Sequence, residues 1–278
     1  MFDVSHPEVV RTVQCALAED IGSGDITTEL TVPADRKASG AFYAREPMVV
    51  AGTELLAVIY NLLGGVESIE LLKHSGDPAE PGECLARVRG AARLLLTAER
   101  TALNFIQRLS GVATLAHEFS MAVAGTKCRI LDTRKTTPGL RVLEKMASAA
   151  GGITNHRQGL FDAILIKNNH ITAAGGVRAA LSAVAGQTIP VEIEVRTLVE
   201  LDEALECGAT RLLLDNLTPE AAREWIARIA GRASIELSGG ITLETARAYA
   251  EAGADFVSAG AITHSARALD INFRLELK

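Results

Sequence analysis

Three short polar segments hold most of the chemistry that this sequence could perform. Each combines cationic side chains with residues that favour turns: Asp132–Gly139, Asn155–Arg157 and Lys167–His170. The chain as a whole carries a net charge of -6 at pH 7, so these cations are concentrated locally against the overall balance. Arginine and lysine side chains in a sheltered site suit carboxylates and phosphates. The segments therefore predict a pocket for a small, strongly anionic substrate.

Short apolar runs precede these segments and alternate with helical stretches from about residue 128 onward. The predicted strands are Cys128–Asp132, Asp162–Lys167, Val191–Val195, Arg211–Asp215, Ser234–Ser238 and Asp255–Gly260. The predicted helices are Leu140–Ala149, Gly176–Val184, Leu198–Glu206, Pro219–Ile229 and Leu243–Glu251. Such alternation predicts βαβ units around a parallel sheet.

The polar residues fall at the carboxyl ends of the predicted strands, where α/β barrels place their active sites. We therefore expect an α/β fold with an open, six- to seven-stranded parallel barrel. A doubly wound sheet is the alternative, but it would use one crevice rather than every strand end.

Residues 1–111 show a different pattern, which predicts an N-terminal α+β, sandwich-like domain. Its predicted helices are Pro7–Asp20, Thr53–Leu63 and Ala91–Leu109, and its predicted strands are Lys37–Arg45, Ser68–Lys73 and Leu85–Val88. In the tail, residues 268–278, apolar and polar residues alternate strictly, as in a half-exposed antiparallel strand. We expect this tail strand to complete the N-terminal domain, which leaves residues 112–267 for the barrel.

Composition argues against several classes of protein. The acidic balance and an aromatic content of 4% disfavour a nucleic-acid partner. Four cysteines without a CxxC pair, and a start without a signal-peptide pattern, favour a reduced, cytoplasmic protein. The apolar stretch 48–66 contains Glu54, which costs about 2.5–3.5 kcal/mol at a membrane centre. We expect a buried helix there and no membrane partner.

Carboxylates and glycines at the strand ends complete the candidate site. Side-chain alternation turns Glu192 and Glu194 to the same side, where Lys167 is a suitable ion-pair partner. We expect Glu192 to belong to a structural ion network in the barrel floor, and Glu194 to lie nearer the mouth. Asp215 also ends a strand. The glycine-containing ends Ser238–Gly240 and Gly260–Ile262 suit a phosphate.

Any single lysine or arginine in these loops could instead be a solvated surface charge. A binding site is favoured because all of these cations lie at the same end of the predicted barrel. No two histidines have metal-ligand spacing. His170 and His264 could orient their neighbours or complete helix ends.

The order of the motifs resembles that of the quinolinate phosphoribosyltransferase family. The matching segments are Ala18–Thr28, Ala98–Gly111, Asp132–Leu140, Asn155–Leu160, Leu165–His170, Ser238–Ile241 and Gly260–Ser265. They extend across nearly the whole chain. The resemblance implies an open barrel beside an N-terminal sandwich-like domain, assembled as a homodimer. It also implies transfer of phosphoribosyl from 5-phosphoribosyl 1-pyrophosphate to quinolinate with Mg²⁺, giving nicotinate mononucleotide, pyrophosphate and CO2 in NAD biosynthesis.

The resemblance implies a role for each matching residue. Arg134, Arg157 and Lys167 would bind the two carboxylates of quinolinate, with His156 in the same pocket and Arg100 supplied by the partner subunit. Lys135 would lie near the diphosphate, and Glu194 and Asp215 would face the ribose hydroxyls and Mg²⁺. Thr133 belongs to the substrate-binding set, and the 5-phosphate would bind at Ser238, Gly239, Gly240, Gly260, Ala261 and Ile262. The residues expected to act in catalysis are Lys135, Lys167, Glu194 and Asp215.

Departures from the family pattern occur at Asn168, Ile153–Thr154 and Arg196, and none removes an expected ligand. Three other readings compete. A related enzyme of the same fold could act on another anionic acceptor, but the four cations Arg100, Arg134, Arg157 and Lys167 would then lack partners. A non-catalytic sensor of phosphoribosyl pyrophosphate would not need Glu194 and Asp215. A phosphate-binding barrel lyase would explain the glycine loops but not the cationic clusters.

Overall fold

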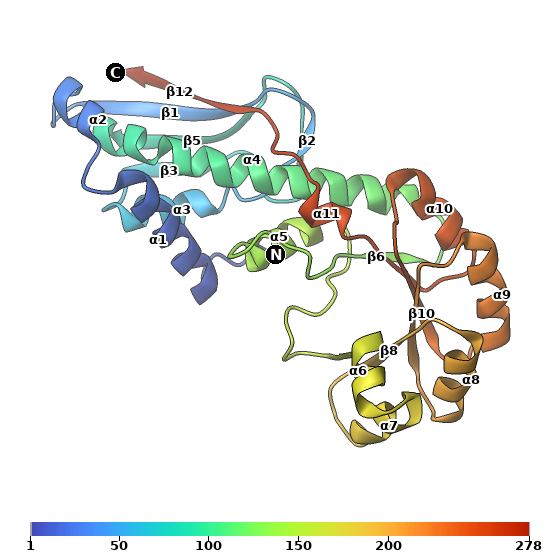
Figure 1. Ribbon diagram of the computed structural model, residues 1–278. Coiled ribbons are helices and arrows are strands. Elements are labelled where there is room, and N and C mark those ends of the chain that lie inside the picture. The colour runs from blue at the N-terminus through green and yellow to red at the C-terminus, as the bar shows by residue number, and fades with distance from the viewer. Residues whose placement is uncertain (1, 278) are drawn as a thin grey trace. The chain divides into compact units, whose positions relative to one another are not determined.

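The computed structural model describes residues 2–277, which form two units (Figure 1). The first unit runs up to His117 and also includes Thr136–Gly152 and the chain from Ser265 onward. The second unit consists of Glu118–Lys135 and Ile153–His264. The segment Thr136–Gly152, which lies inside the barrel range expected from sequence, thus groups with the N-terminal unit. Each unit is described by itself below.

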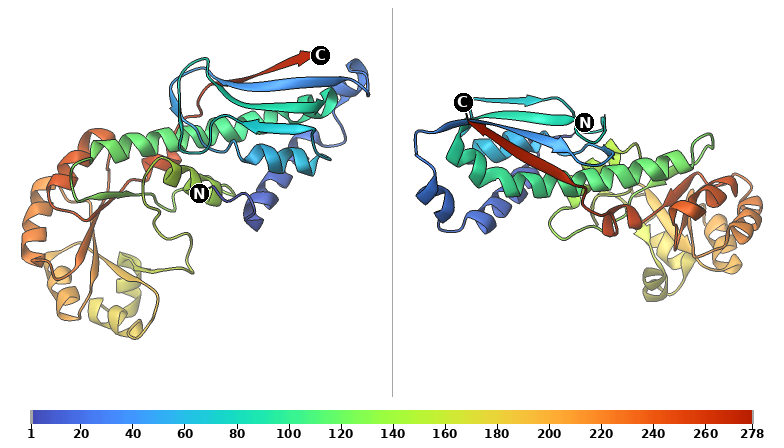
Figure 2. Two further views of the ribbon diagram at one scale, coloured as in Figure 1. Left: turned by 180° about the vertical axis from the view of Figure 1, so that it is seen from behind. Right: turned by 90° about the horizontal axis from the view of Figure 1, so that it is seen from above.

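A four-stranded antiparallel sheet organises the first unit (Figure 2). Its strand order is β12 (Ile271–Leu277), β1 (Lys37–Ala44), β5 (Cys84–Ala91) and β3 (Ser68–Leu71). Strand β12 pairs with β1 from Ala44↔Ile271 to Ala38↔Leu277, so the tail joins the N-terminal sheet as its alternation predicts. Helices α1 (Pro7–Ile21), α3 (Leu55–Leu62) and α4 (Ala92–Ala122) complete the main frame of this unit, although α4 extends five residues past His117.

The pairing of β12 with β1 depends on a glycine. The rings of Phe42 and Phe273 lie 4.9 Å apart. A Cβ atom at Gly40 would lie 2.1 Å from the Phe273 ring, so no larger side chain fits there without moving that ring. Burial alternates along β1, with Phe42 fully buried, as expected for a sheet with one covered face.

Three short elements of the first unit were not predicted, whereas the helix Arg141–Ala150 matches the predicted helix Leu140–Ala149. Helix α2 (Ile26–Thr31) begins at Asp25, whose carboxylate accepts a hydrogen bond from the Thr28 N–H at 2.9 Å. Strands β2 (Met48–Val49) and β4 (Pro78–Ala79) pair with each other. Helix α5 (Arg141–Ala150) follows the first polar segment. The apolar stretch 48–66 forms β2 and α3, and no helix among residues 2–277 is long and apolar enough to cross a membrane.

The second unit contains a six-stranded sheet in which every neighbouring pair is parallel. Its strand order is β6 (Arg129–Leu131), β11 (Phe256–Ser258), β10 (Ser234–Ser238), β9 (Arg211–Asp215), β8 (Val191–Val195) and β7 (Ile164–Ile166). A parallel bridge between Leu131 and Thr154 extends the β6 edge by one residue pair. The predicted open parallel α/β barrel is confirmed.

Helices alternate with the barrel strands as predicted. They are α6 (Asn168–Ala174), α7 (Val177–Ala183), α8 (Leu198–Glu206), α9 (Pro219–Ile229), α10 (Leu243–Glu251) and α11 (Ala261–His264). The Thr218 hydroxyl accepts a hydrogen bond from the Ala221 N–H at the start of α9, and Thr242 caps α10. The short helices α6 and α11 were not predicted, because each begins inside a polar motif.

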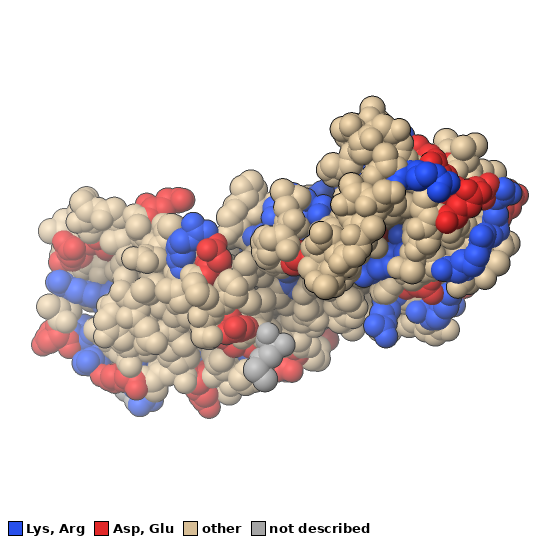
Figure 3. Space-filling model, turned by 90° about the horizontal axis from the view of Figure 1, so that it is seen from below, with Lys and Arg blue, Asp and Glu red and all other residues tan. Residues whose placement is uncertain are grey.

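Charged side chains of both signs are interspersed on the face shown in Figure 3.

Candidate active site

The register of the barrel strands brings side chains from several strands to one face of the sheet, at two successive levels. Leu165 on β7 pairs with Glu192 on β8, while Leu213 on β9 pairs with both Glu194 on β8 and Glu236 on β10. In a parallel sheet, residues at one level share a face. Leu165, Leu213 and Glu236 all line a cavity of about 600 Å³ within the second unit. This position matches the strand-end site expected for the fold.

Most of the residues predicted for the site line this cavity. They are Thr133, Arg134, Lys135, His156, Arg157, Lys167, Ser238, Gly239, Gly240, Gly260 and Ala261. Glu194, Asp215 and Ile262 belong to the same unit but are not among the lining residues. Arg100 is an exposed residue of α4 in the first unit. The structure thus brings together the predicted acceptor and phosphate residues, but not Arg100.

Positive charge dominates the cavity. Arg134, Lys135, Arg157 and Lys167 line it, and Glu236 is the only carboxylate among the described lining residues. The Nε atom of Arg134 is buried and has no hydrogen-bond partner among the described residues. Burial, and then the charge of Arg134, lower the pKa of Arg157, which shows that the two guanidinium groups repel each other. An anionic ligand would relieve this repulsion.

Lys167 and Glu194 form an ion pair across neighbouring strands. The Lys167 Nζ donates to Glu194 Oε2 at 3.2 Å, and Glu194 is 5% exposed whereas Lys167 is half-exposed. The sequence predicted Lys167 as a partner for this carboxylate. Asp215, on the next strand, accepts a hydrogen bond from the Asn216 side chain at 2.6 Å.

Asp132 fixes the loop that carries His156 and Arg157. Its fully buried carboxylate accepts hydrogen bonds from the His156 N–H at 2.8 Å and from the Asn155 amide at 2.6 Å. The Arg157 guanidinium donates to the Ala163 carbonyl at 3.1 Å, across the same loop. These contacts pre-organise two of the cavity cations before any ligand binds.

His156 lies between two buried carboxylates rather than at the surface. Its Nε2 atom is 3.4 Å from Glu192 Oε2 and 3.4 Å from Glu236 Oε2. Burial disfavours charge on the ring, but hydrogen bonds and charges from the two glutamates outweigh burial and raise the pKa of His156 to about 9. Glu192 was expected in a structural ion network, and its partner in that network is His156.

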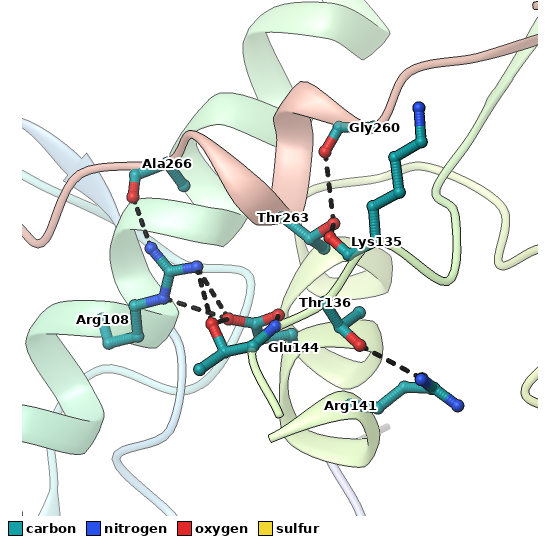
Figure 4. Close-up of polar contacts among 9 residues, drawn as sticks. Arg108, Lys135, Thr136, Arg141, Glu144, Gly260, Thr263 and Ala266 are labelled. Carbon is teal, nitrogen blue, oxygen red and sulfur yellow. Dashed lines mark hydrogen bonds and ion pairs between the residues drawn. The ribbon is translucent and has the colours of Figure 1, made fainter. Parts of the chain in front are cut away.

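The two glycine-containing strand ends are shaped by close neighbours. Gly239 has a φ of +102°, and a Cβ atom there would lie 2.2 Å from the Asn216 side chain. A Cβ atom at Gly260 would lie 2.8 Å from the Lys135 side chain. The Thr263 hydroxyl donates to the Lys135 carbonyl at 2.8 Å, which joins the last strand-end loop to the first (Figure 4). The glycines thus keep the backbone open beside the cationic side chains.

Figure 4 also shows a buried ion pair within the first unit. The fully buried Glu144 accepts from the Arg108 guanidinium at 2.7 Å and from the Thr137 N–H at 2.9 Å. Arg108 also donates to the Ala266 carbonyl. This cluster holds the segment 136–144 against helix α4.

Sequence reasoning missed several lining residues. They are Leu165, Leu213, Glu236, Ile241, Thr242, Ser258 and His264. Glu236 could have been found, because alternation along Ser234–Ser238 places it on the same side as Ser238, as it does for Glu192 and Glu194.

Comparison with known proteins agrees with the geometry. Residues 25–110 match the model of the quinolinate phosphoribosyl transferase N-terminal domain, and residues 112–274 match that of the C-terminal domain. The chain belongs to the quinolinate phosphoribosyltransferase family.

Relatives with this family's name span the chain. The nicotinate-nucleotide pyrophosphorylase [carboxylating] of Mycobacterium leprae is 44% identical over 272 residues, covering 95% of this chain and 96% of the relative. A tobacco quinolinate phosphoribosyltransferase [decarboxylating], named as mitochondrial, is 39% identical over 296 residues and covers 98% and 84%. The solved nicotinate-nucleotide pyrophosphorylase of Francisella tularensis superimposes with a TM-score of 0.92 at 37% identity, covering 97% of each chain.

Proposed function

We propose that this protein transfers the phosphoribosyl group of 5-phosphoribosyl 1-pyrophosphate to the ring nitrogen of quinolinate and removes one carboxylate. The products are nicotinate mononucleotide, pyrophosphate and CO2, a step of de novo NAD biosynthesis. The observation that carries the proposal is the cavity of the second unit, where four permanent cations face a single carboxylate. Such an excess of charge suits a dicarboxylate together with phosphates.

The acceptor end of the cavity would bind quinolinate. Arg134, Arg157 and Lys167 supply charge for two adjacent carboxylates, and Leu165 and Leu213 supply apolar surface for the ring. The buried, unpartnered Nε of Arg134 is a donor that a substrate carboxylate would satisfy. His156 lies at the same end.

The glycine-containing strand ends would bind the 5-phosphate. Ser238–Gly240 and Gly260–Ala261 line the cavity, Gly239 and Gly240 have positive φ, and their backbone N–H groups would bind the phosphate. Lys135 would add positive charge near the diphosphate. Thr133 lies beside Lys135 on the same loop.

Glu194 would stabilise the transition state of the transfer. Cleavage of the anomeric bond builds positive charge on the ribose, and a buried carboxylate beside it is favourable in a water-poor site. Substrate carboxylates would compete for Lys167 and free Glu194 from its ion pair. After transfer, the cationic ring nitrogen stabilises the electron pair that CO2 leaves on the adjacent ring carbon, and the Lys167 ammonium would donate the proton that replaces the lost carboxylate. The protein holds the ring in place during this step.

Mg²⁺ fits the carboxylates present. Glu194 and Asp215 offer oxygen ligands on adjacent strands, which is the ligand type that Mg²⁺ prefers. Bound there with the substrate diphosphate, the ion would offset charge on the leaving pyrophosphate. We further propose a cytoplasmic homodimer in which the exposed Arg100 reaches the acceptor pocket of the partner subunit.

Acceptor choice tests the proposal. Purified protein with phosphoribosyl pyrophosphate and Mg²⁺ should form a mononucleotide from quinolinate and not from nicotinate, which lacks one carboxylate. Equal turnover of nicotinate, or cleavage of phosphoribosyl pyrophosphate without an acceptor, would contradict it.

A further inference from the structure

Two carboxylates at the barrel floor have no role in the function proposed above. Glu192 on β8 is 5% exposed and Glu236 on β10 is 2% exposed. Both place an oxygen 3.4 Å from Nε2 of His156. Buried carboxylates are costly unless they are paired, so their arrangement around one imidazole requires an explanation.

The His156 ring is held at both nitrogens. On the other side from the glutamates, Nδ1 accepts a hydrogen bond from the Arg157 N–H at 2.6 Å. A nitrogen that accepts in this way cannot also carry a proton. In the neutral ring the proton therefore belongs on Nε2, where the two carboxylates can accept a hydrogen bond from it.

The two glutamates act together on that proton. One Nε2–H bonds well to one carboxylate at a time, and Glu236 Oε2 has no hydrogen-bond partner among the described residues. Glu236 is also the carboxylate that lines the cavity. The two carboxylates also favour the charged form of the ring, so the pKa of His156 rises to about 9 despite burial.

We propose that Glu192 and Glu236 are positioning residues that act through His156, fixing its proton on Nε2 and its ring beside Arg157. The kinetic part rests on the proposed function, because it concerns the pocket for the pyridine dicarboxylate. Without the glutamates the ring can turn or change tautomer, and the backbone of Arg157 loses a fixed acceptor. Binding of the dicarboxylate should weaken, whereas binding of phosphoribosyl pyrophosphate at the glycine-containing strand ends should not.

A divalent metal site is the competing explanation for this arrangement. The ligand atoms of His156, Glu192 and Glu236 lie within 4.8 Å of one another, close enough to bind one ion. A histidine that binds metal through Nε2 almost always donates its other N–H to an acceptor. Here Nδ1 accepts a hydrogen bond instead. The structure therefore favours the proton.

Nitrogen NMR of histidine-labelled protein tests the proposal without any need for turnover. We expect the neutral ring of His156, observed above its raised pKa of about 9 and assigned with a His156→Asn variant, to carry its proton on Nε2. Glu236→Gln and Glu192→Gln should each bring the Nδ1–H tautomer of the neutral ring into the spectrum, whereas Glu224→Gln, at an exposed position of α9, should leave it unchanged. A neutral ring with its proton on Nδ1 in the unaltered protein, unchanged signals in both variants, or one equivalent of bound metal that Glu236→Gln removes would overturn the proposal.

Kinetics supply the second readout. Glu236→Gln should raise KM for quinolinate about tenfold, because the ring of His156 loses one of the two charges beside Nε2, and change KM for phosphoribosyl pyrophosphate less than twofold. Glu236→Asp, which keeps the charge, should recover part of the loss. Equal rises in both KM values would contradict a local positioning role. If the unaltered protein shows the expected NMR signals but does not turn over quinolinate, the proposed function is wrong. The positioning of His156 by Glu192 and Glu236 is then still supported.

Discussion

The ammonium of Lys167 and the carboxylate of Glu194 lie 3.2 Å apart at the ends of neighbouring parallel strands. Glu194 is buried, so it depends on this cation for charge balance as long as no substrate is bound. The pair gives a buried carboxylate a cationic partner beside a strongly cationic cavity.

The first prediction concerns Glu194. Glu194→Gln should lower kcat about 100- to 1,000-fold, because charge on the ribose in the transition state loses its partner. KM for quinolinate should change little. Steady-state kinetics with both substrates check this, and a variant that raises KM for quinolinate with unchanged kcat would place Glu194 in acceptor binding instead.

The second prediction concerns Thr263, which donates to the Lys135 carbonyl at 2.8 Å. Thr263→Val keeps the shape but removes the bond, which costs about 1 kcal/mol and releases the backbone that carries Lys135. We expect a several-fold higher KM for phosphoribosyl pyrophosphate. Thr263→Ser, which retains the hydroxyl, is the matched control and should behave as the unaltered protein.

The third prediction concerns stability in the first unit. Glu144→Ala leaves Arg108 and the Thr137 N–H without their buried acceptor. Loss of one partner of a buried pair costs about 3–5 kcal/mol in the free energy of unfolding. Urea denaturation measures it. Glu206→Ala, which breaks the exposed ion pair with Arg178, should change the free energy of unfolding little. A similar loss of stability in both variants would contradict the greater importance of the buried pair.

The fourth prediction concerns acid pH. Hydrogen bonds from Arg267 and from the Asp270 N–H lower the pKa of Glu46 below its ordinary value of 4.5. Its contribution to stability is therefore complete above pH 4.5 and is lost as the pH falls through the lowered value. Protection factors against hydrogen exchange in β12 should fall over that range, because these contacts anchor the chain before the strand. Glu46→Gln should show the lower protection factors already at neutral pH and lose the acid dependence.

The fifth prediction tests the proposed dimer. Arg100→Ala and Lys167→Ala chains should each be inactive alone. Mixed dimers should regain activity, because one of the two sites then contains both an intact Lys167 and the partner's intact Arg100. No recovery in verified mixed dimers would assign Arg100 to the site of its own subunit.

Much of the barrel could be predicted because each strand is mainly apolar and has a polar residue at or near its carboxyl end. Lys167, Glu194 and Asp215 mark strand ends in the sequence, and the structure places them there. The tail strand could also be predicted from the sequence. Strict alternation of apolar and polar residues indicates a strand with one covered face and one exposed face.

Other features depend on contacts that sequence spacing does not specify. Glu192 lies next to His156 because Asp132 folds the Asn155–Arg157 loop over the barrel, and nothing local predicts that bond. Likewise, Arg108 and Glu144 hold the segment 136–152 in the first unit, although it follows a barrel strand.

The central claim is that one cavity couples phosphoribosyl transfer to loss of a carboxylate. The most direct measurement uses quinolinate labelled in its 2-carboxylate, with phosphoribosyl pyrophosphate and Mg²⁺. If the proposed reaction is right, we expect labelled CO2 and unlabelled nicotinate mononucleotide in equal amounts, with neither formed when any component is omitted. Mononucleotide that retains the label, or CO2 released without phosphoribosyl pyrophosphate, would contradict it.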